Sequence, residues 1–339
     1  MAVERPAQSP QPERRWRRLP LLLLPALAVA VSVGAVAKSG RLGPIKAWHY
    51  QLKRLDLALA ARSDADIIVM DHSRNGRASG LYRPEEIEGL RARPGKAERR
   101  VLAYLSVGEA EEYRFYWNPD WKRERPAWLM GENCRWPDNY LVRFWMDAWK
   151  DIIFRGRESY LAQILAAGFD GVYLDRVDAY WDLRKTAPGG RAKMIDLVVE
   201  LSHMARRLKP GAIVVVQNAE DLLSDRRYRA AIDGIAKEDL LYGVEGTGQR
   251  NAASEIDWSL GQLKRLAAEG KPVLVVEYLQ DAQTMARARR ELEDHGFVAA
   301  FADRTLDGRD PLHGATKPDA RAAIGTPEFA LKHCDKGHD

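Results

Sequence analysis

Residues 168–178 read Gly-Phe-Asp-Gly-Val-Tyr-Leu-Asp-Arg-Val-Asp. A turn with glycines at 168 and 171 leads into a short apolar strand that ends on Asp175, and Asp178 follows three residues later. A bare carboxylate buried in an apolar core costs several kcal/mol. Asp175 is therefore expected at the rim of a sheet, in water or in a functional site.

Other apolar runs also stop at an acid. Asp71, Glu109, Glu277 and Asp303 each follow a run of apolar residues. Carboxylates that collect at the carboxyl ends of many parallel strands are typical of a β/α barrel with an acidic, hydrolytic mouth.

The rest of the chain repeats this strand and helix alternation. Strands are predicted at 48–52, 67–71, 101–107, 172–175, 213–218, 234–238, 273–278 and 297–302. Helices are predicted at 55–62, 84–92, 147–167, 192–208, 224–232, 252–269 and 285–295, several of them ending at a glycine: Gly168, Gly211, Gly270 and Gly296.

Val/Ile-rich strands separated by helices predict a parallel sheet buried on both faces. We therefore expect an α/β fold, a single-domain (β/α)8 TIM barrel over residues 44–312. No glycine-rich cofactor loop follows the first strand, which disfavours an open doubly wound sheet.

One connection, after the third strand, is unusually long. About 37 residues separate Glu109 from the next predicted helix. Segments of this length without structure are usually functional or disordered, and aromatic residues argue against disorder. Two interpretations stay open: a lid that presents rings to sugars, or a satellite core that packs the loop onto the barrel. The segment holds six of the ten tryptophans: Trp117, Trp121, Trp128, Trp136, Trp145 and Trp149.

The N-terminus has the pattern of an export signal. Arginines at 14, 15, 17 and 18 precede an apolar run over residues 19–37 that ends Ala-Val-Ala. Residues 1–37 are therefore predicted to be a signal peptide of an exported, periplasmic or extracellular protein. An uncleaved membrane anchor is the alternative, because the run is close to the length of a membrane span. Residues 313–339 are expected to form a C-terminal tail.

Charge and cysteines exclude several classes of protein. The leader holds five Arg and two Glu, so it carries three of the five net positive charges, and no basic aromatic stripe predicts nucleic-acid binding. Cys134 and Cys334 could pair after export, or remain separate thiols. Neither lies in a metal-binding spacing, the histidines form no ligand pair, and no nucleophile elbow is present. No metal site and no cofactor are predicted.

Polar side chains at the predicted strand ends fit glycoside hydrolysis. This reaction uses two carboxyl groups, one as acid and one as base or nucleophile, and requires no cofactor. Asp175 is the first candidate, and Asp178 is interpreted as a loop or substrate contact. Gln217 and Asn218 end a fully apolar strand, so they either bind a ligand or form an internal network. For each acid, capping of a helix or pairing with an arginine remains the structural alternative.

Three segments resemble a known family. The runs 103–111 (Ala-Tyr-Leu-Ser-Val-Gly-Glu-Ala-Glu) and 168–175, with the Gln217-Asn218 strand end, are similar to the endo-α-1,4-polygalactosaminidases of glycoside hydrolase family 114. The resemblance spans residues 48–303. It implies a TIM barrel that cleaves α-1,4-linked galactosamine polysaccharide, with Asp175 as nucleophile and Glu238 as acid/base. Asp239 and Glu245 lie close to Glu238 and could replace it.

The sequence thus predicts a secreted, retaining endo-glycosidase with a polysaccharide substrate. The expected substrate-binding residues are Asp71, Tyr104, Glu109, Asp178, Gln217, Asn218, Glu277, Tyr278, Asp303, Trp117 and Trp121. A non-catalytic carbohydrate-binding or exopolysaccharide accessory protein on the same barrel is the main alternative. A metal-dependent deacetylase is disfavoured by the missing histidine pattern.

Overall fold

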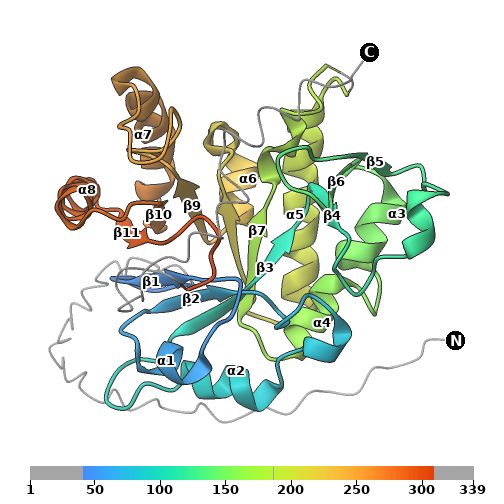
Figure 1. Cartoon of the computed structure of the whole chain (residues 1–339), viewed down its shortest axis with the longest axis horizontal. Helices are drawn as coiled ribbons and strands as arrows, with labels where there is room; N and C mark the ends of the chain where they lie inside the picture. Colours follow the sequence, from blue (N-terminus) through green and yellow to red (C-terminus); the bar gives the residue numbers. More distant parts are fainter. Residues whose placement is uncertain (1–40, 186, 309–339) are drawn as a thin grey trace, which may run out of the picture. The chain divides into compact units, whose positions relative to one another are not determined.

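The computed structural model describes residues 41–185 and 187–308 (Figure 1). Its main sheet has eight parallel strands, in the order β1-β2-β3-β7-β8-β9-β10-β11. All eight predicted strands are confirmed, close to their predicted bounds. They are β1 (Trp48–Tyr50), β2 (Ile67–Met70), β3 (Arg100–Ser106), β7 (Gly171–Asp175), β8 (Ile213–Gln217), β9 (Gly234–Glu238), β10 (Val273–Glu277) and β11 (Val298–Phe301).

The first and last strands meet at a seam. Within the described residues no backbone ladder joins β1 to β11. Instead Trp48 Nε1 donates a hydrogen bond to the carbonyl of Val298 at 3.0 Å, and the carbonyl of Leu306 accepts from the backbone nitrogens of Leu52 and Lys53. The sheet is thereby nearly closed, and the fold is the predicted (β/α)8 barrel.

Helices connect consecutive strands around the barrel. They are α1 (Leu57–Arg62), α2 (Pro84–Arg91), α4 (Tyr160–Ala166), α5 (Gly190–Leu208), α6 (Arg226–Ala231), α7 (Ala253–Ala267) and α8 (Ala282–Asp294). Side-chain oxygens cap several of their first turns, namely those of Asp56, Ser159, Asp225 and Asp281. Gly168, Gly211, Gly270 and Gly296 all have positive φ just beyond a helix, which confirms the predicted glycine ends.

Two apolar layers hold the fold together. One lies between the sheet and the helices, and the other fills the barrel interior. Inside the barrel, the rings of Trp48, Tyr50 and Tyr173 pack together, with Tyr50 and Tyr173 centroids 5.1 Å apart. The barrel is therefore a filled core, and ligands have access only at its rim.

The prediction of one helix over residues 147–167 is wrong. The chain forms α3 (Asp147–Lys150), a π-helical turn η3 (Asp151–Arg155) and then, after a break, α4. Gly156 ends the first piece in extended backbone, and Ser159 caps the second. A glycine followed three residues later by a capping serine is a stop and start signal that the long apolar pattern concealed.

The long connection between β3 and β7 contains a small antiparallel sheet, which we did not predict. Its strands β4 (Glu109–Glu111), β6 (Asn139–Val142) and β5 (Leu129–Glu132) pair in that order. Trp128 and Trp149 are buried behind it. These rings belong to the same apolar layer as the outer face of the sheet, so the insertion is packed onto the barrel, which agrees with the satellite-core interpretation.

Several predictions fall on residues outside the described range. These are the leader 1–37, the tail 313–339 and Cys334, so the pairing of Cys134 with Cys334 stays a prediction. Among the helices that the structure describes, none combines the length and the apolar character that crossing a membrane requires.

Candidate active site

Asp175 and Glu238 end strands β7 and β9, on either side of β8. Between them lies Gln217, the last residue of β8. Its amide nitrogen Nε2 donates to Asp175 Oδ1 at 3.0 Å and to Glu238 Oε2 at 2.6 Å. The two carboxyl groups that the sequence singled out therefore share one hydrogen-bond donor at the rim of the barrel.

Asp175 has two further donors. The hydroxyl of Tyr104 on β3 donates to Oδ2 at 2.7 Å, and the backbone nitrogen of Arg176 donates to Oδ1 at 2.7 Å. Asp175 keeps partial contact with solvent. Its carboxylate is thus fixed in position by three donors, Gln217, Tyr104 and the backbone of Arg176.

Glu238 is held by neighbours on both sides. Asn218 Nδ2 donates to Oε2 at 3.0 Å, and Asn218 Oδ1 in turn accepts from the backbone nitrogen of Glu238 at 3.1 Å. The hydroxyl of Tyr278, just after β10, donates to Oε1. The structure therefore brings together Tyr104, Asp175, Gln217, Asn218, Glu238 and Tyr278, all of them predicted site residues.

The surroundings give the two carboxyl groups different affinities for a proton. Burial, reinforced by the charge of Asp175, raises the pKa of Glu238 to about 7. Burial also raises the pKa of Asp175, but the hydrogen bond from Tyr104 and the charge of Arg176 act in the opposite direction. Near neutral pH this arrangement favours an ionised Asp175 beside a protonated Glu238.

The backbone is strained immediately after these side chains. Arg176, Asn218, Ala219 and Asp239 have φ values of 57°, 57°, 53° and 51°. Non-glycine residues rarely adopt this left-handed conformation, which costs on the order of 1–3 kcal/mol per residue. The strands β7, β8 and β9 thus end in the same strained turn. The chain changes direction directly after Asp175, Gln217 and Glu238.

A second group of charges surrounds Arg176. Its guanidinium forms ion pairs with Glu109 at 2.8 Å, with Asp178 at 3.2 Å and with Asp182. Glu109 also accepts from Asn133 Nδ2 at 2.7 Å. Glu109 and Asp178, two predicted substrate contacts, are therefore tied to the residue that follows Asp175.

Asp71 belongs to a buried cluster in the adjacent part of the mouth. Arg114 Nη1 lies 2.9 and 2.7 Å from its two carboxylate oxygens, and His72 Nδ1 lies 3.0 Å from Oδ1. Arg114 Nε also donates to Glu111 at 2.6 Å. Although burial acts to raise the pKa of Asp71, Arg114 and His72 bring it below its ordinary value. In the described part of the chain, no group of three or more His, Cys, Asp or Glu is arranged to hold a metal ion.

Two other predicted acids lie away from the pair. Glu277 alternates with the inward-facing Val276 and Tyr278, so it points to the outer side of β10. There it accepts from the backbone nitrogens of Leu241 at 2.7 Å and Tyr242 at 3.2 Å. Asp303 accepts from the backbone nitrogen of Thr305 in the loop after β11. These contacts shape the loops around the site.

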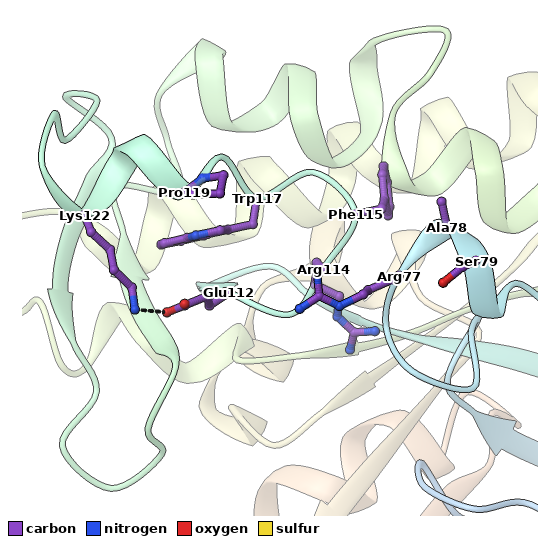
Figure 2. A pocket seen from close by; sticks show the side chains of 9 residues that line it. All are labelled: Arg77, Ala78, Ser79, Glu112, Arg114, Phe115, Trp117, Pro119 and Lys122. Carbon is purple, nitrogen blue, oxygen red and sulfur yellow. Dashed lines mark ion pairs between the residues drawn. The ribbon is translucent and has the colours of Figure 1, made fainter.

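Trp117 and Trp121 lie in the insertion and are partly buried. The ring of Trp117 stacks on Tyr140 with centroids 4.9 Å apart, and its other ring contact is an edge of Trp121. Trp117 also lines a cavity beside the loop after β2 (Figure 2). Contact of either ring with a polymer stays a prediction.

Burial of Glu277 makes the stability of the fold pH-dependent. Burial and the charge of Asp239 raise its pKa to about 8, whereas an exposed Glu has about 4.3. Between these values the folded protein binds a proton that the unfolded chain releases. This contribution of Glu277 to the stability of the fold is complete below about pH 4.3 and is lost as the pH rises through about 8.

We expect Glu277→Gln to flatten the fall in the free energy of unfolding between about pH 5 and 8, by up to about 1.4 kcal/mol per pH unit. Urea unfolding at several pH values measures this, with the exposed Glu255→Gln as control. An identical slope in both variants would contradict it.

Comparison with known families identifies this arrangement. The model of glycoside hydrolase family GH114 matches residues 31–316. The chain belongs to this family. It is therefore a glycoside hydrolase, as the resemblance predicted. An uncharacterized protein of Methanocaldococcus jannaschii is 38% identical over 277 residues, covering 77% of each chain. One of Thermotoga maritima is 34% identical over 292 residues, covering 82% of this chain and 87% of the relative.

Two solved structures share the fold. The glycoside hydrolase domain of PelA from Pseudomonas aeruginosa superposes with a TM-score of 0.59 at 19% identity, over 78% of this chain and 97% of that domain. Ega3 of Aspergillus fumigatus, solved in complex with galactosamine, gives 0.57 at 19% identity, over 78% and 94%. At this identity the likeness establishes the barrel architecture of this GH114 chain.

Sequence reasoning missed several residues of the GH114 site. Arg114 and Arg176 organise the acids on either side. Tyr50 lies in the barrel interior, where burial above all, and to a lesser degree Tyr173 and the charge of Asp175, raise its pKa. Trp181, which follows the strand-end loop of β7, is 52% exposed. Only Arg176 had a usable signal, since it adjoins the predicted nucleophile. Arg114 lies in the aromatic insertion, which has no periodic pattern.

Proposed function

We propose that this glycoside hydrolase is a retaining endo-hydrolase of α-1,4-linked galactosamine-type polysaccharide. Asp175 attacks the anomeric carbon, and Glu238 protonates the leaving oxygen and then takes a proton from water. The observation that carries this proposal is the single nitrogen of Gln217 bound to both carboxyl groups.

That shared nitrogen limits how far apart the two groups lie. The nearest oxygens of Asp175 and Glu238 cannot be further apart than the sum of the two hydrogen bonds, 3.0 and 2.6 Å. Retaining pairs are about 5–5.5 Å apart, and inverting pairs about 6.5–9.5 Å, because the latter must admit a water molecule. The geometry favours the shorter class. The raised pKa of Glu238 supplies an acid that still carries its proton near neutral pH.

The substrate class rests on relatives and on charge. Ega3 was solved with galactosamine, and PelA carries a glycoside hydrolase domain of the same fold. The rim around Asp175 and Glu238 holds three further acids, Asp178, Asp182 and Asp239, and the two arginines that pair with them leave the rim with an excess of negative charge. A carboxylate-rich mouth attracts a polymer whose free amines are protonated.

The decisive experiment is incubation of the purified domain with α-1,4-linked galactosamine and N-acetylgalactosamine oligomers, followed by mass spectrometry. We expect internal cleavage, with products of intermediate length. Binding of the oligomers without cleavage would instead support the non-catalytic accessory protein. Cleavage from one chain end only would reject the endo mode.

A retaining mechanism makes a specific stereochemical prediction. Two successive inversions at the anomeric carbon give a first product with the α configuration of the substrate. An NMR time course recorded faster than mutarotation distinguishes the outcomes. If the β-anomer forms first, the covalent role of Asp175 is rejected.

Export is part of the proposal. The pattern of residues 1–37, a basic stretch and then an apolar run that ends Ala-Val-Ala, supports a cleaved leader. We expect the native protein to begin near residue 38 when its N-terminus is determined by mass spectrometry. A full-length species retained in membranes would favour the anchored alternative.

A further inference from the structure

A cavity of about 390 Å³ lies between the loop after β2 and the insertion, and neither Asp175 nor Glu238 lines it. Figure 2 shows one wall formed by the loop after β2, with Arg77, Ala78 and Ser79, and the other by the insertion. The insertion contributes Glu112, Arg114, Phe115, Trp117, Pro119 and Lys122. This volume is within the roughly 300–1,000 Å³ of small-ligand sites.

The cavity is connected to the active pair through two side chains. Arg114 forms part of its wall, and the Arg114 guanidinium lies 5.7 Å from the ring centroid of Tyr104. Tyr104 in turn donates to Asp175. Arg114 and Tyr104 therefore lie between the cavity and Asp175, near the carboxyl ends of β2 and β3.

The carboxylates of the cavity are already occupied. Glu112 forms an ion pair with Lys122 at 2.7 Å and accepts from the hydroxyl of Tyr140 at 3.3 Å. The charge of Arg114 is matched by Asp71 and Glu111. An incoming ammonium group would find no free carboxylate to bind.

Arg77 gives the cavity its uncompensated charge. It is exposed, and no acid within residues 41–185 and 187–308 forms an ion pair with it. Its backbone is fixed independently, because its carbonyl accepts from Ser73 Oγ at 2.7 Å. Phe115, Trp117 and Pro119 supply apolar surface around it. A guanidinium beside apolar rings suits a neutral group that offers a carbonyl oxygen and a methyl.

We propose that this cavity is a subsite for an N-acetylated amino sugar, next to an acidic cleavage site that takes free-amine units. The acetamido carbonyl accepts a hydrogen bond from Arg77, and the methyl group packs on the apolar wall. The inference rests on the proposed function, and it adds that the enzyme selects partly acetylated segments of its polymer.

Charge reversal at Arg77 tests the subsite without disturbing the packed rings. Two oligomers of equal length are compared, one fully de-N-acetylated and one that contains N-acetyl units. We expect the wild type to prefer the acetylated oligomer in kcat/KM, and Arg77→Glu to reduce that preference by roughly tenfold, the value of one charged hydrogen bond. The matched control is Arg125→Glu, which makes the same charge change at an exposed site of the insertion that does not line the cavity.

The failures of the two proposals are distinguishable. If the wild type prefers the fully de-N-acetylated oligomer, or if Arg77→Glu and Arg125→Glu change the ratio equally, the subsite is rejected while hydrolysis stands. If no oligomer is cleaved, the proposed function fails, and calorimetric titration of the same two oligomers still measures the preference of the cavity. Tighter binding of a uronic-acid oligomer than of the N-acetylated one would also overturn the assignment.

Discussion

Asp175→Asn is expected to lower kcat on polymer by on the order of 10⁴-fold or more, because the substitution removes the oxygen that attacks the anomeric carbon. Single-turnover hydrolysis of an oligomer that the wild type cleaves measures the loss. The effect should appear in kcat with little change in the affinity for substrate, since the shape of the mouth is retained.

The fold should survive this substitution. An asparagine oxygen at the position of Oδ1 still accepts from Gln217 and from the backbone nitrogen of Arg176. The hydroxyl of Tyr104, which donates to Oδ2, can turn and accept from the new amide. An unchanged melting temperature checks this. Asp178→Asn, which removes a charge from the same cluster, serves as control and should cost far less activity. Near-normal hydrolysis by Asp175→Asn would make Glu109 or Asp71 the next candidate.

Glu238→Gln is expected to reduce polymer hydrolysis by roughly 10²–10⁴-fold, the usual contribution of a positioned general acid. Its hydrogen bonds to Gln217 and Asn218 can remain on the amide oxygen. An aryl glycoside with a good leaving group needs little protonation, so glycosyl transfer from it should be much less affected. That difference between two substrates separates loss of an acid from general damage to the site.

The pH profile provides a second readout for Glu238. Because the acid must be protonated, kcat/KM of the wild type should fall as the pH rises through about 7. Glu238→Gln has no titratable group at this position, so its kcat/KM on the aryl substrate should not fall as the pH rises through about 7. If kcat/KM of Glu238→Gln still falls with rising pH as in the wild type, another group is the acid. Asp239 is then the nearest alternative.

The strand pattern predicted where acids meet but could not say which way they point. A strand that is buried on both faces is a continuous run of apolar residues. The sequence therefore does not show which of its side chains point into the barrel and which point outward. Asp175 and Glu277 end their strands with the same signal. One faces the rim beside Gln217, and the other caps a loop on the outer side of β10. The resemblance to a family distinguished them, because it included the Asp175 segment.

Side chains that approach from outside the strands were beyond prediction. Arg114 reaches Asp71 only because the insertion folds back over the end of β2. The left-handed turns at Arg176, Ala219 and Asp239 carry no glycine that would have marked them. Tertiary packing imposes these conformations against the backbone preferences of the residues themselves. A prediction from neighbouring residues in the sequence cannot detect them.

The insertion between β3 and β7 starts at the carboxyl end of β3, beside the carboxyl pair. Ser106, where the chain leaves the barrel, is the register partner of Asp175, and the chain returns through α4 to Gly171 at the other end of β7. The entropy of closing such a segment rises only with the logarithm of its length, by about 0.6 kcal/mol for each doubling. A change in the length of this segment is thus inexpensive in chain entropy. Its contacts with the barrel are a different matter, because Arg114 pairs with Asp71, Glu109 pairs with Arg176, and Trp149 Nε1 donates to the carbonyl of Val107. A transplanted insertion would therefore have to bring its barrel partners with it.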